Sequence, residues 1–344
     1  MTGRYCIDRY LSGSFAPLYD GMQINKAECG LFCRPDQLAQ VTLATDIVGT
    51  VTPQAAALTG LAPGTSVLTG TGDSGAESVS CGVFSPGSMM IQLGSTCFFI
   101  YYTDHLPATA QLSPGPYLIP GGLCIAAGTN NGGTLTKWYR DQLFPTLLQQ
   151  ERQGGENAYA AMAKLAAEIP AGSDGLFTLP YFAGERAPID DPQAKGMIFG
   201  LQSHHTRAHL YKSALEGIGY SIAQYFEQLT ENGLPVSRVM AVGGGTKNPL
   251  WLQIIADMLG REMFVPQVTI GACYGDALLC AMACGCYESW EHLGAHIQIQ
   301  QTIRPIERNH TVYQAGKQIF QSLYESTKRW MHQPAPRTEG DDMQ

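Results

Sequence analysis

Three strand-like apolar runs in this chain of 344 residues each lead into a glycine-rich turn. The turns lie at 70–75, 94–96 and 243–245, and helix-like segments separate them. Because glycine has no Cβ, a turn of this kind at a strand end lets a ligand come close to the backbone. Strands and helices in alternation predict an α/β fold.

The first turn carries an acidic residue, Asp73, within the string Gly-Thr-Gly-Asp-Ser-Gly. A carboxylate at such a strand end can take a proton from a substrate hydroxyl. One such residue together with several glycine turns suggests phosphoryl transfer from a nucleotide. The alternative is a turn aspartate that hydrogen-bonds to its own backbone.

The third turn does not fit either common nucleotide-binding motif. A P-loop needs Gly-Lys-Ser/Thr after four spacer residues, but here Thr246 separates Gly245 from Lys247 and is followed by Asn248. The Gly-x-Gly-x-x-Gly dinucleotide fingerprint is also missing. A glycine turn remains, before a helix near Pro249 whose positive end would face a ligand. A tight strand-to-helix turn without a ligand is the alternative.

The composition argues against two classes of partner, nucleic acids and membranes. The net charge of −8 offers no basic face for nucleic acid. No apolar stretch approaches the roughly 20 residues of a membrane-spanning helix, and the first residues lack the apolar core of a signal peptide. We therefore expect a cytoplasmic protein with neither a nucleic-acid nor a membrane partner.

Ten cysteines raise the question of disulfides or metal binding. They are spread through apolar segments, for example at Cys97, Cys124, Cys280 and Cys284, which predicts buried free thiols in a reducing compartment. The group that ends with Cys286 has no nearby histidine and lacks the spacing of a zinc module. No metal site is predicted from protein side chains.

Periodicity and turn signals place the remaining elements. We expect helices over 54–58, 74–82, 134–147, 156–169, 205–232, 249–259, 272–284 and 311–331. We expect strands over 66–72, 88–93, 97–102, 123–127, 239–242 and 263–265.

An ordered set of short motifs resembles the FGGY family of carbohydrate kinases. After the turns at 70–75 and 94–96 come Gly-Glu-Arg-Ala-Pro at 184–188 with Asp191-Pro192, Gly-Met-Ile-Phe-Gly-Leu at 196–201, Glu-Gly-Ile-Gly-Tyr at 216–220, the glycine triplet with Asn248, and Tyr-Gly-Asp-Ala at 274–277. Each motif is short, but their order from about residue 40 to 320 is specific. Within the family the chain looks most like the xylulokinase-like sugar kinases.

This resemblance implies an actin-like ATPase (ribonuclease H-like) fold and ATP-dependent phosphorylation of a sugar or polyol hydroxyl, with ATP and Mg²⁺ as cofactors. It also implies a division of the chain. Residues 1–65 would be a remnant of the amino-terminal sugar-binding domain, 66–332 a complete carboxy-terminal nucleotide-binding domain, and 333–344 a disordered tail.

The resemblance also implies roles for individual residues. Asp73 matches the general base; the other matches, on the nucleotide side, are Gly94 and Ser95 at the phosphates, Gly133 and Lys137 near ribose and phosphate, and Gly244 and Asn248 at adenosine. The chain departs from the family twice: Lys137 stands where some relatives carry glutamine, and Ser74 replaces an amide residue that is common after the base.

Other charged residues have a simpler explanation. Glu185 and Arg186 belong to a family hallmark loop, but an internal anchor explains them better than ligand contact, and the same holds for Glu216 in its long helix. His204 and His205 come at a helix start, where we expect solvated side chains.

One family motif is missing from the chain. Relatives open with Asp-x-Gly-Thr, which binds phosphate and magnesium; the nearest string here, 46–50, has one residue too many. One hypothesis is a sugar kinase. The alternatives are a catalytically inactive nucleotide-binding remnant and a structural or regulatory module on the same fold. We expect the isolated chain to turn over no sugar at a useful rate and to bind adenine nucleotide weakly through 243–248. Uncovered apolar surface on residues 1–65 would favour a homo-oligomer.

Overall fold

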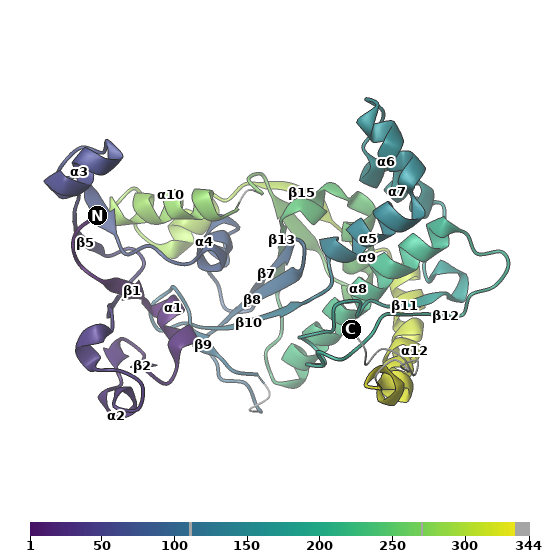
Figure 1. Cartoon of the computed structure of the whole chain (residues 1–344), viewed down its shortest axis with the longest axis horizontal. Helices are drawn as coiled ribbons and strands as arrows, with labels where there is room; N and C mark the ends of the chain where they lie inside the picture. The colour runs from purple at the N-terminus through teal and green to yellow at the C-terminus, as the bar shows by residue number, and fades with distance from the viewer. Residues whose placement is uncertain (110–111, 270, 334–344) are drawn as a thin grey trace, which may run out of the picture.

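A mixed sheet of seven strands forms the centre of the computed structural model, which describes residues 1–109, 112–269 and 271–333 (Figure 1). The strand order is β15-β14-β13-β7-β8-β10-β9. The bounds are β7 (Ser88–Leu93), β8 (Cys97–Thr103), β9 (Gly115–Pro116), β10 (Leu123–Thr129), β13 (Arg238–Val242), β14 (Met263–Pro266) and β15 (Ile299–Ile303).

The pairing of these strands brings three loops to one edge of the sheet. Strand β13 runs parallel to both β7 and β14, so the carboxyl ends of all three lie together. Strand β10 pairs antiparallel with β8, with Thr129 opposite Cys97, and therefore ends beside the β7–β8 turn. The turns at 94–96, 130–133 and 243–248 consequently meet at this edge.

Helices cover both faces of the sheet, as the alternation along β7 requires. Met89, Ile91 and Leu93 face a core shared with five helices, whereas Met90 faces the opposite core, which it shares with three others. The first face carries α5 (Gly133–Leu143), α7 (Ala158–Ala167), α8 (Arg207–Glu231) and α9 (Pro249–Leu259), with α12 (Glu307–Met331) outside; the second carries α4 (Asp73–Ser80) and α10 (Gly271–Ala283), with α11 (Trp290–Ala295) at its end.

The first residues form short elements beside the α4 side of the sheet (Figure 1). These are β1 (Cys6–Asp8), α1 (Arg9–Ser12), β2 (Tyr19–Asp20), β3 (Gln23–Ile24), α2 (Lys26–Cys29), β4 (Gln40–Thr42), β5 (Ile47–Thr50), α3 (Pro53–Thr59) and β6 (Ser66–Leu68). Strand β1 pairs with β4, and β5 pairs with β6 across the expected boundary at residue 65.

Apolar side chains are exposed in this segment, as expected from the sequence. Tyr5 is 87% and Leu58 89% exposed, and Leu31 and Phe32 also face solvent. Self-association through this surface stays a prediction.

The expected elements match the structure where apolar periodicity is strong. Helix α9 has the expected bounds, and the β7–β8 hairpin is confirmed. The helix expected over 134–147 is instead two helices that meet at Phe144, because Pro145 removes a backbone donor and begins α6 (Pro145–Arg152). Strands β11 (Phe177–Leu179) and β12 (Met197–Phe199) form a separate pair.

Two other expectations have a different outcome. Cys97 and Cys124 are buried, but Cys280 and Cys284 are exposed, because the outer side of α10 and the residue that follows it face solvent despite their apolar sequence. The expected disordered tail lies outside the described residues apart from Gln333.

Of the helices in the described part of the chain, none is both long and apolar enough to span a bilayer.

Helix α10 packs directly on α4 through Gly275. A Cβ at this position would lie 1.8 Å from the carbonyl oxygen of Ala76. We expect Gly275→Ala to lower the free energy of unfolding by about 3 kcal/mol, because the two helices must separate. Urea unfolding measures this. Gly30→Ala is the control, since nothing lies within 4 Å of its Cβ position; equal stability of Gly275→Ala and wild type would contradict the packing.

Candidate active site

The β7–β8 turn is bonded directly to the start of α5. The Gly133 amide donates to the Gly94 carbonyl at 2.8 Å, and the Thr134 amide donates to the Ser95 carbonyl at 2.9 Å. A Cβ at Gly133 would lie 2.7 Å from the Gly94 oxygen, so only glycine fits there. The structure thus brings Gly94, Ser95 and Gly133 together, with Ser95 exposed and the positive end of α5 behind it.

The glycine triplet forms a second turn against the same edge. Cβ atoms at Gly243 and Gly245 would collide with Leu93 of β7, so packing explains these two glycines. Gly244 differs, because no atom of the described residues lies within 4 Å of its Cβ position and the residue is exposed. It opens the short 3₁₀ helix η4 (Gly244–Lys247). A flat ligand group could therefore approach the backbone at Gly244.

Asn248 joins this turn to two helices. Its Oδ1 accepts from the Trp251 amide at 3.2 Å and caps α9. Its Nδ2 lies 3.3 Å from the Tyr211 hydroxyl on α8. Lys137 lies one turn into α5 from Gly133 and is exposed. Both positions border the sheet edge, but among the described residues no hydrogen bond or ion pair explains the identity of Lys137.

Asp73 is the first residue of α4 and is exposed. Its Oδ1 accepts from the Ser74 amide at 2.8 Å, the local bond expected of a turn aspartate. Helix α4 packs on the sheet face opposite α5 and α9. In the described part of the chain the hydrogen bond of the Asp73 side chain is this local one, and none joins it to the glycine turns.

The amino-terminal segment holds the turn that carries Asp73. The Thr71 hydroxyl donates to Asp8 Oδ2 at 3.1 Å, and the Tyr10 hydroxyl lies 3.0 Å from Ser74 Oγ. Asp8 also caps α1, and burial raises the pKa of its carboxyl. Ser74 is thus engaged by Tyr10. Sequence reasoning missed this support, because short segments with weak periodicity give no tertiary signal.

Glu185 anchors the hallmark loop from inside the protein. It is 1% exposed and accepts from the amides of Asn130 at 2.7 Å and Arg186 at 2.9 Å. Burial raises the pKa of the Glu185 carboxyl to about 7. The Arg186 guanidinium donates to the Thr129 carbonyl at 3.3 Å. Both residues hold the loop at 130–133 beside α5, which confirms the structural interpretation.

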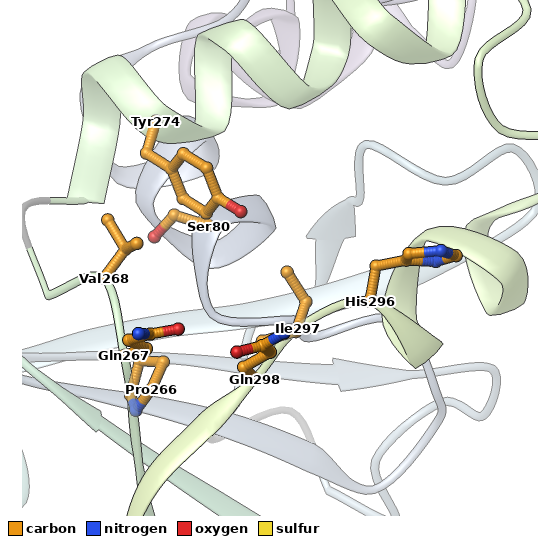
Figure 2. Close-up of a pocket in the computed structure, with 8 residues that line it drawn as sticks. All are labelled: Ser80, Pro266, Gln267, Val268, Tyr274, His296, Ile297 and Gln298. Atoms are coloured by element: carbon orange, nitrogen blue, oxygen red, sulfur yellow. The ribbon is translucent and has the colours of Figure 1, made fainter.

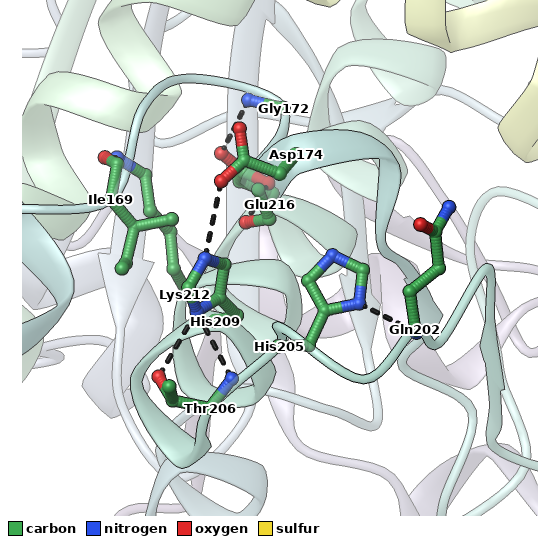
Figure 3. Close-up of polar contacts among 10 residues, drawn as sticks. Ile169, Gly172, Asp174, Gln202, His205, Thr206, His209, Lys212 and Glu216 are labelled. Carbon is green, nitrogen blue, oxygen red and sulfur yellow. Dashed lines mark hydrogen bonds and ion pairs between the residues drawn. The ribbon is translucent and has the colours of Figure 1, made fainter.

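Glu216 has a similar role on α8. It accepts from the Gly172 amide, the Ser173 hydroxyl and the Tyr313 hydroxyl at 2.7–2.9 Å, and burial raises the pKa of its carboxyl to about 7. Figure 3 shows the neighbouring His209 between Thr206 and Asp174, with its ring 3.2 Å from the Asp174 carboxylate.

The expectation of two solvated histidines at the start of α8 holds for one of them. His204 is exposed, but His205 is half-buried, with Nδ1 accepting from the Gln202 amide at 2.9 Å (Figure 3).

A cavity of about 190 Å³ lies away from the predicted site residues. Figure 2 shows Ser80 of α4 and Tyr274 of α10 on one side, with the ends of β14 and β15 on the other, at Gln267 and Gln298. None of the residues that line it was singled out for ligand binding by the sequence. The predicted residues instead border exposed turns at the carboxyl edge of the sheet.

Comparison with known proteins places most of the chain in one protein family. The model of the FGGY family of carbohydrate kinases, C-terminal domain, matches residues 89–284, which is more than half of the chain. Asp73 lies before this range. The structure of xylulose kinase from Rhodospirillum rubrum superposes with a TM-score of 0.84 at 29% identity, over 97% of this chain and 66% of that one. The expected α/β, actin-like ATPase fold is confirmed.

Curated relatives agree with this match. Gluconokinase of Bacillus subtilis (strain 168) is 29% identical over 292 residues, which cover 84% of this chain and 57% of that protein. Xylulose kinase of the same organism is 28% identical over 292 residues, which cover 82% and 55%. The chain spans just over half the length of these relatives.

Glu185 makes stability depend on pH. Its folded-state pKa is raised to about 7, so the stabilising contribution of its protonated form is complete below the ordinary pKa and is lost as the pH rises through about 7. From pH 4 to 8 we expect the wild type to lose at most about 3 kcal/mol relative to Glu185→Gln, which cannot ionise. Urea unfolding across this pH range measures the difference, and parallel curves would contradict it.

Proposed function

Because this chain belongs to the FGGY family of carbohydrate kinases, we propose that it carries the nucleotide-binding site and the general base for ATP-dependent phosphorylation of a sugar or polyol hydroxyl. The observation that carries this proposal is the meeting of the 94–96, 130–133 and 243–248 turns at the carboxyl edge of parallel strands. In open α/β sheets, ligands bind outside the carboxyl ends of the strands.

In this proposal, each turn binds a different part of the nucleotide. Ser95 is exposed at the tip of the β7–β8 turn, where the positive end of α5 favours phosphate. Gly244 leaves room for adenine, and Asn248 offers an amide that can bind the base or ribose. Lys137 supplies a positive charge one turn into α5. Exposure and spacing support these roles, and each one is a proposal.

Asp73 accepts the proton of the acceptor hydroxyl in this scheme. As the hydroxyl oxygen bonds to the γ-phosphorus, the bond from phosphorus to the bridging oxygen breaks and ADP leaves. The proton moves to a carboxylate oxygen of Asp73. Such a reaction depends on positioning and charge stabilisation, so an exposed aspartate on a firmly held turn suits the role.

Magnesium would enter with the nucleotide. Mg²⁺ is commonly bound through one or two carboxylates together with substrate phosphates, and it neutralises charge on them. In the described part of the chain no cluster of three or more His, Cys, Asp and Glu could hold a metal ion. We propose that the ion binds through the ATP phosphates.

The acceptor class follows from the relatives. They are named as kinases of gluconate and xylulose, and we propose that this chain acts on an open-chain polyhydroxylated acceptor of this size.

The nucleotide assignment predicts a specific loss of ATP affinity. Asn248→Asp still caps α9 but loses the amide donor and adds a negative charge, so we expect ATP·Mg²⁺ to bind at least about tenfold more weakly. Calorimetric titration measures this. Asn25→Asp is the matched control, because Asn25 caps α2 with its side-chain oxygen in the same way. Equal losses in both variants, or none in either, would contradict the assignment.

The base assignment predicts a loss of turnover without a loss of ATP binding. Where the wild-type chain turns over gluconate, a ketose or a polyol in coupled ADP release, we expect Asp73→Asn to lower kcat by about 10²- to 10⁴-fold. Asp20→Asn, an exposed aspartate on β2, is the control. Undiminished turnover in Asp73→Asn would refute the base. ATP binding without turnover on any acceptor would leave the alternative of a nucleotide-binding chain that is not a kinase.

A further inference from the structure

Glu77 is a buried carboxylate that the proposed chemistry does not use. It lies on α4 four residues after Asp73, the spacing at which side chains share a helix face. Only 7% of it is exposed, and no ion pair joins it to a cation in the described part of the chain. Burial, followed by the charge of Asp73, raises the pKa of its carboxyl.

The partner of Glu77 is Gln92, whose side-chain Nε2 donates to Glu77 Oε2. Gln92 is the penultimate residue of β7, two positions before Gly94. Because side chains alternate along a strand, Gln92 shares the α4 face with Met90, while Leu93 packs on the other face. The bond therefore connects the helix of the base to the strand that ends in the 94–96 turn.

The first residue of helix α10 also packs against the Glu77 side chain. A Cβ at Gly271 would lie 2.2–2.6 Å from Cγ, Cδ and Oε1 of Glu77, so the first residue of α10 sits directly on the carboxylate. The Glu77 side chain is therefore held between α10 and β7 and has little freedom to turn away from Gln92.

A buried ionisable group with one neutral partner is costly to keep. Apolar residues of similar volume often serve stability as well or better. A directional bond, unlike apolar packing, fixes how two elements lie against each other. The arrangement therefore points to a need for fixed geometry between α4 and the end of β7.

We propose that Glu77 and Gln92 are positioning residues whose bond couples the base helix to the nucleotide turn. ATP bound at 94–96 would then restrain α4 and orient Asp73. This inference rests on the proposed function, because it assumes that ATP binds at this turn. Neither residue needs to touch the substrate.

Amide hydrogen exchange of the full chain, with and without ATP·Mg²⁺, tests the coupling. In the wild type we expect ATP to slow exchange both at the start of α5 and in α4. In Gln92→Ala we expect the slowing at α5 to remain and the slowing in α4 to disappear, with ATP affinity within about threefold of wild type. Glu77→Gln keeps an acceptor for Gln92 and should retain the coupling. Gln301→Ala, at an exposed glutamine on β15 of the same sheet, is the control.

A second variant guards against simple misfolding. Glu77→Met combined with Gln92→Leu replaces both partners with apolar groups of similar size, so the protein should stay folded while the directional bond is lost. We expect it to bind ATP but to show no slowing in α4. Where turnover is measurable, its kcat should fall about tenfold or more with KM for ATP unchanged.

The outcomes separate this inference from the proposed function. A wild-type chain that binds no ATP would overturn both. A chain that binds ATP, but whose α4 exchange is unaffected by ATP or responds equally in wild type, Gln92→Ala and the apolar double variant, would overturn the positioning role alone.

Discussion

The parallel pairing of β13 with β7 is the constraint on which the rest of the structure depends. It places Val242 beside Gln92, so the chain leaves both strands at the same edge. The hairpin to β8 and the return along β10 then bring a third loop to that edge. Glycines are needed where these loops touch, because the Gly133 amide bonds to Gly94 and a side chain at Gly133 would meet that carbonyl.

Buried carboxylates fix the loops around this edge. Glu185 accepts amides from two loops, Glu216 holds the chain before β11 to α8, and Glu77 links α4 to β7. Burial raises the pKa of all three. Loops that must present a ligand site have little apolar surface to pack, so directional bonds to a buried acceptor give them a defined position.

Sequence patterns could predict the elements and part of the site, but not the contacts between distant segments. Period-two and period-3.6 patterns are local, which is why β7, β8 and α9 were recognisable. The order of the motifs identified the family, and one of these motifs contains both Gly94 and Ser95. The support of the Asp73 turn by Asp8 and Tyr10 depends on residues more than 60 positions away, and no local pattern reports such a contact. The roles of the predicted site residues remain proposals.

The central claim is that the nucleotide lies at the carboxyl edge of the sheet, across the 94–96 and 243–248 turns. Photolabelling with an azido-adenine analogue of ATP, followed by peptide mapping, tests it most directly. We expect the label to appear on the peptide carrying 243–248 and to be displaced by ATP. Displaceable label found instead on peptides that line the cavity between α4, α10 and β14, such as the one carrying His296, would contradict it.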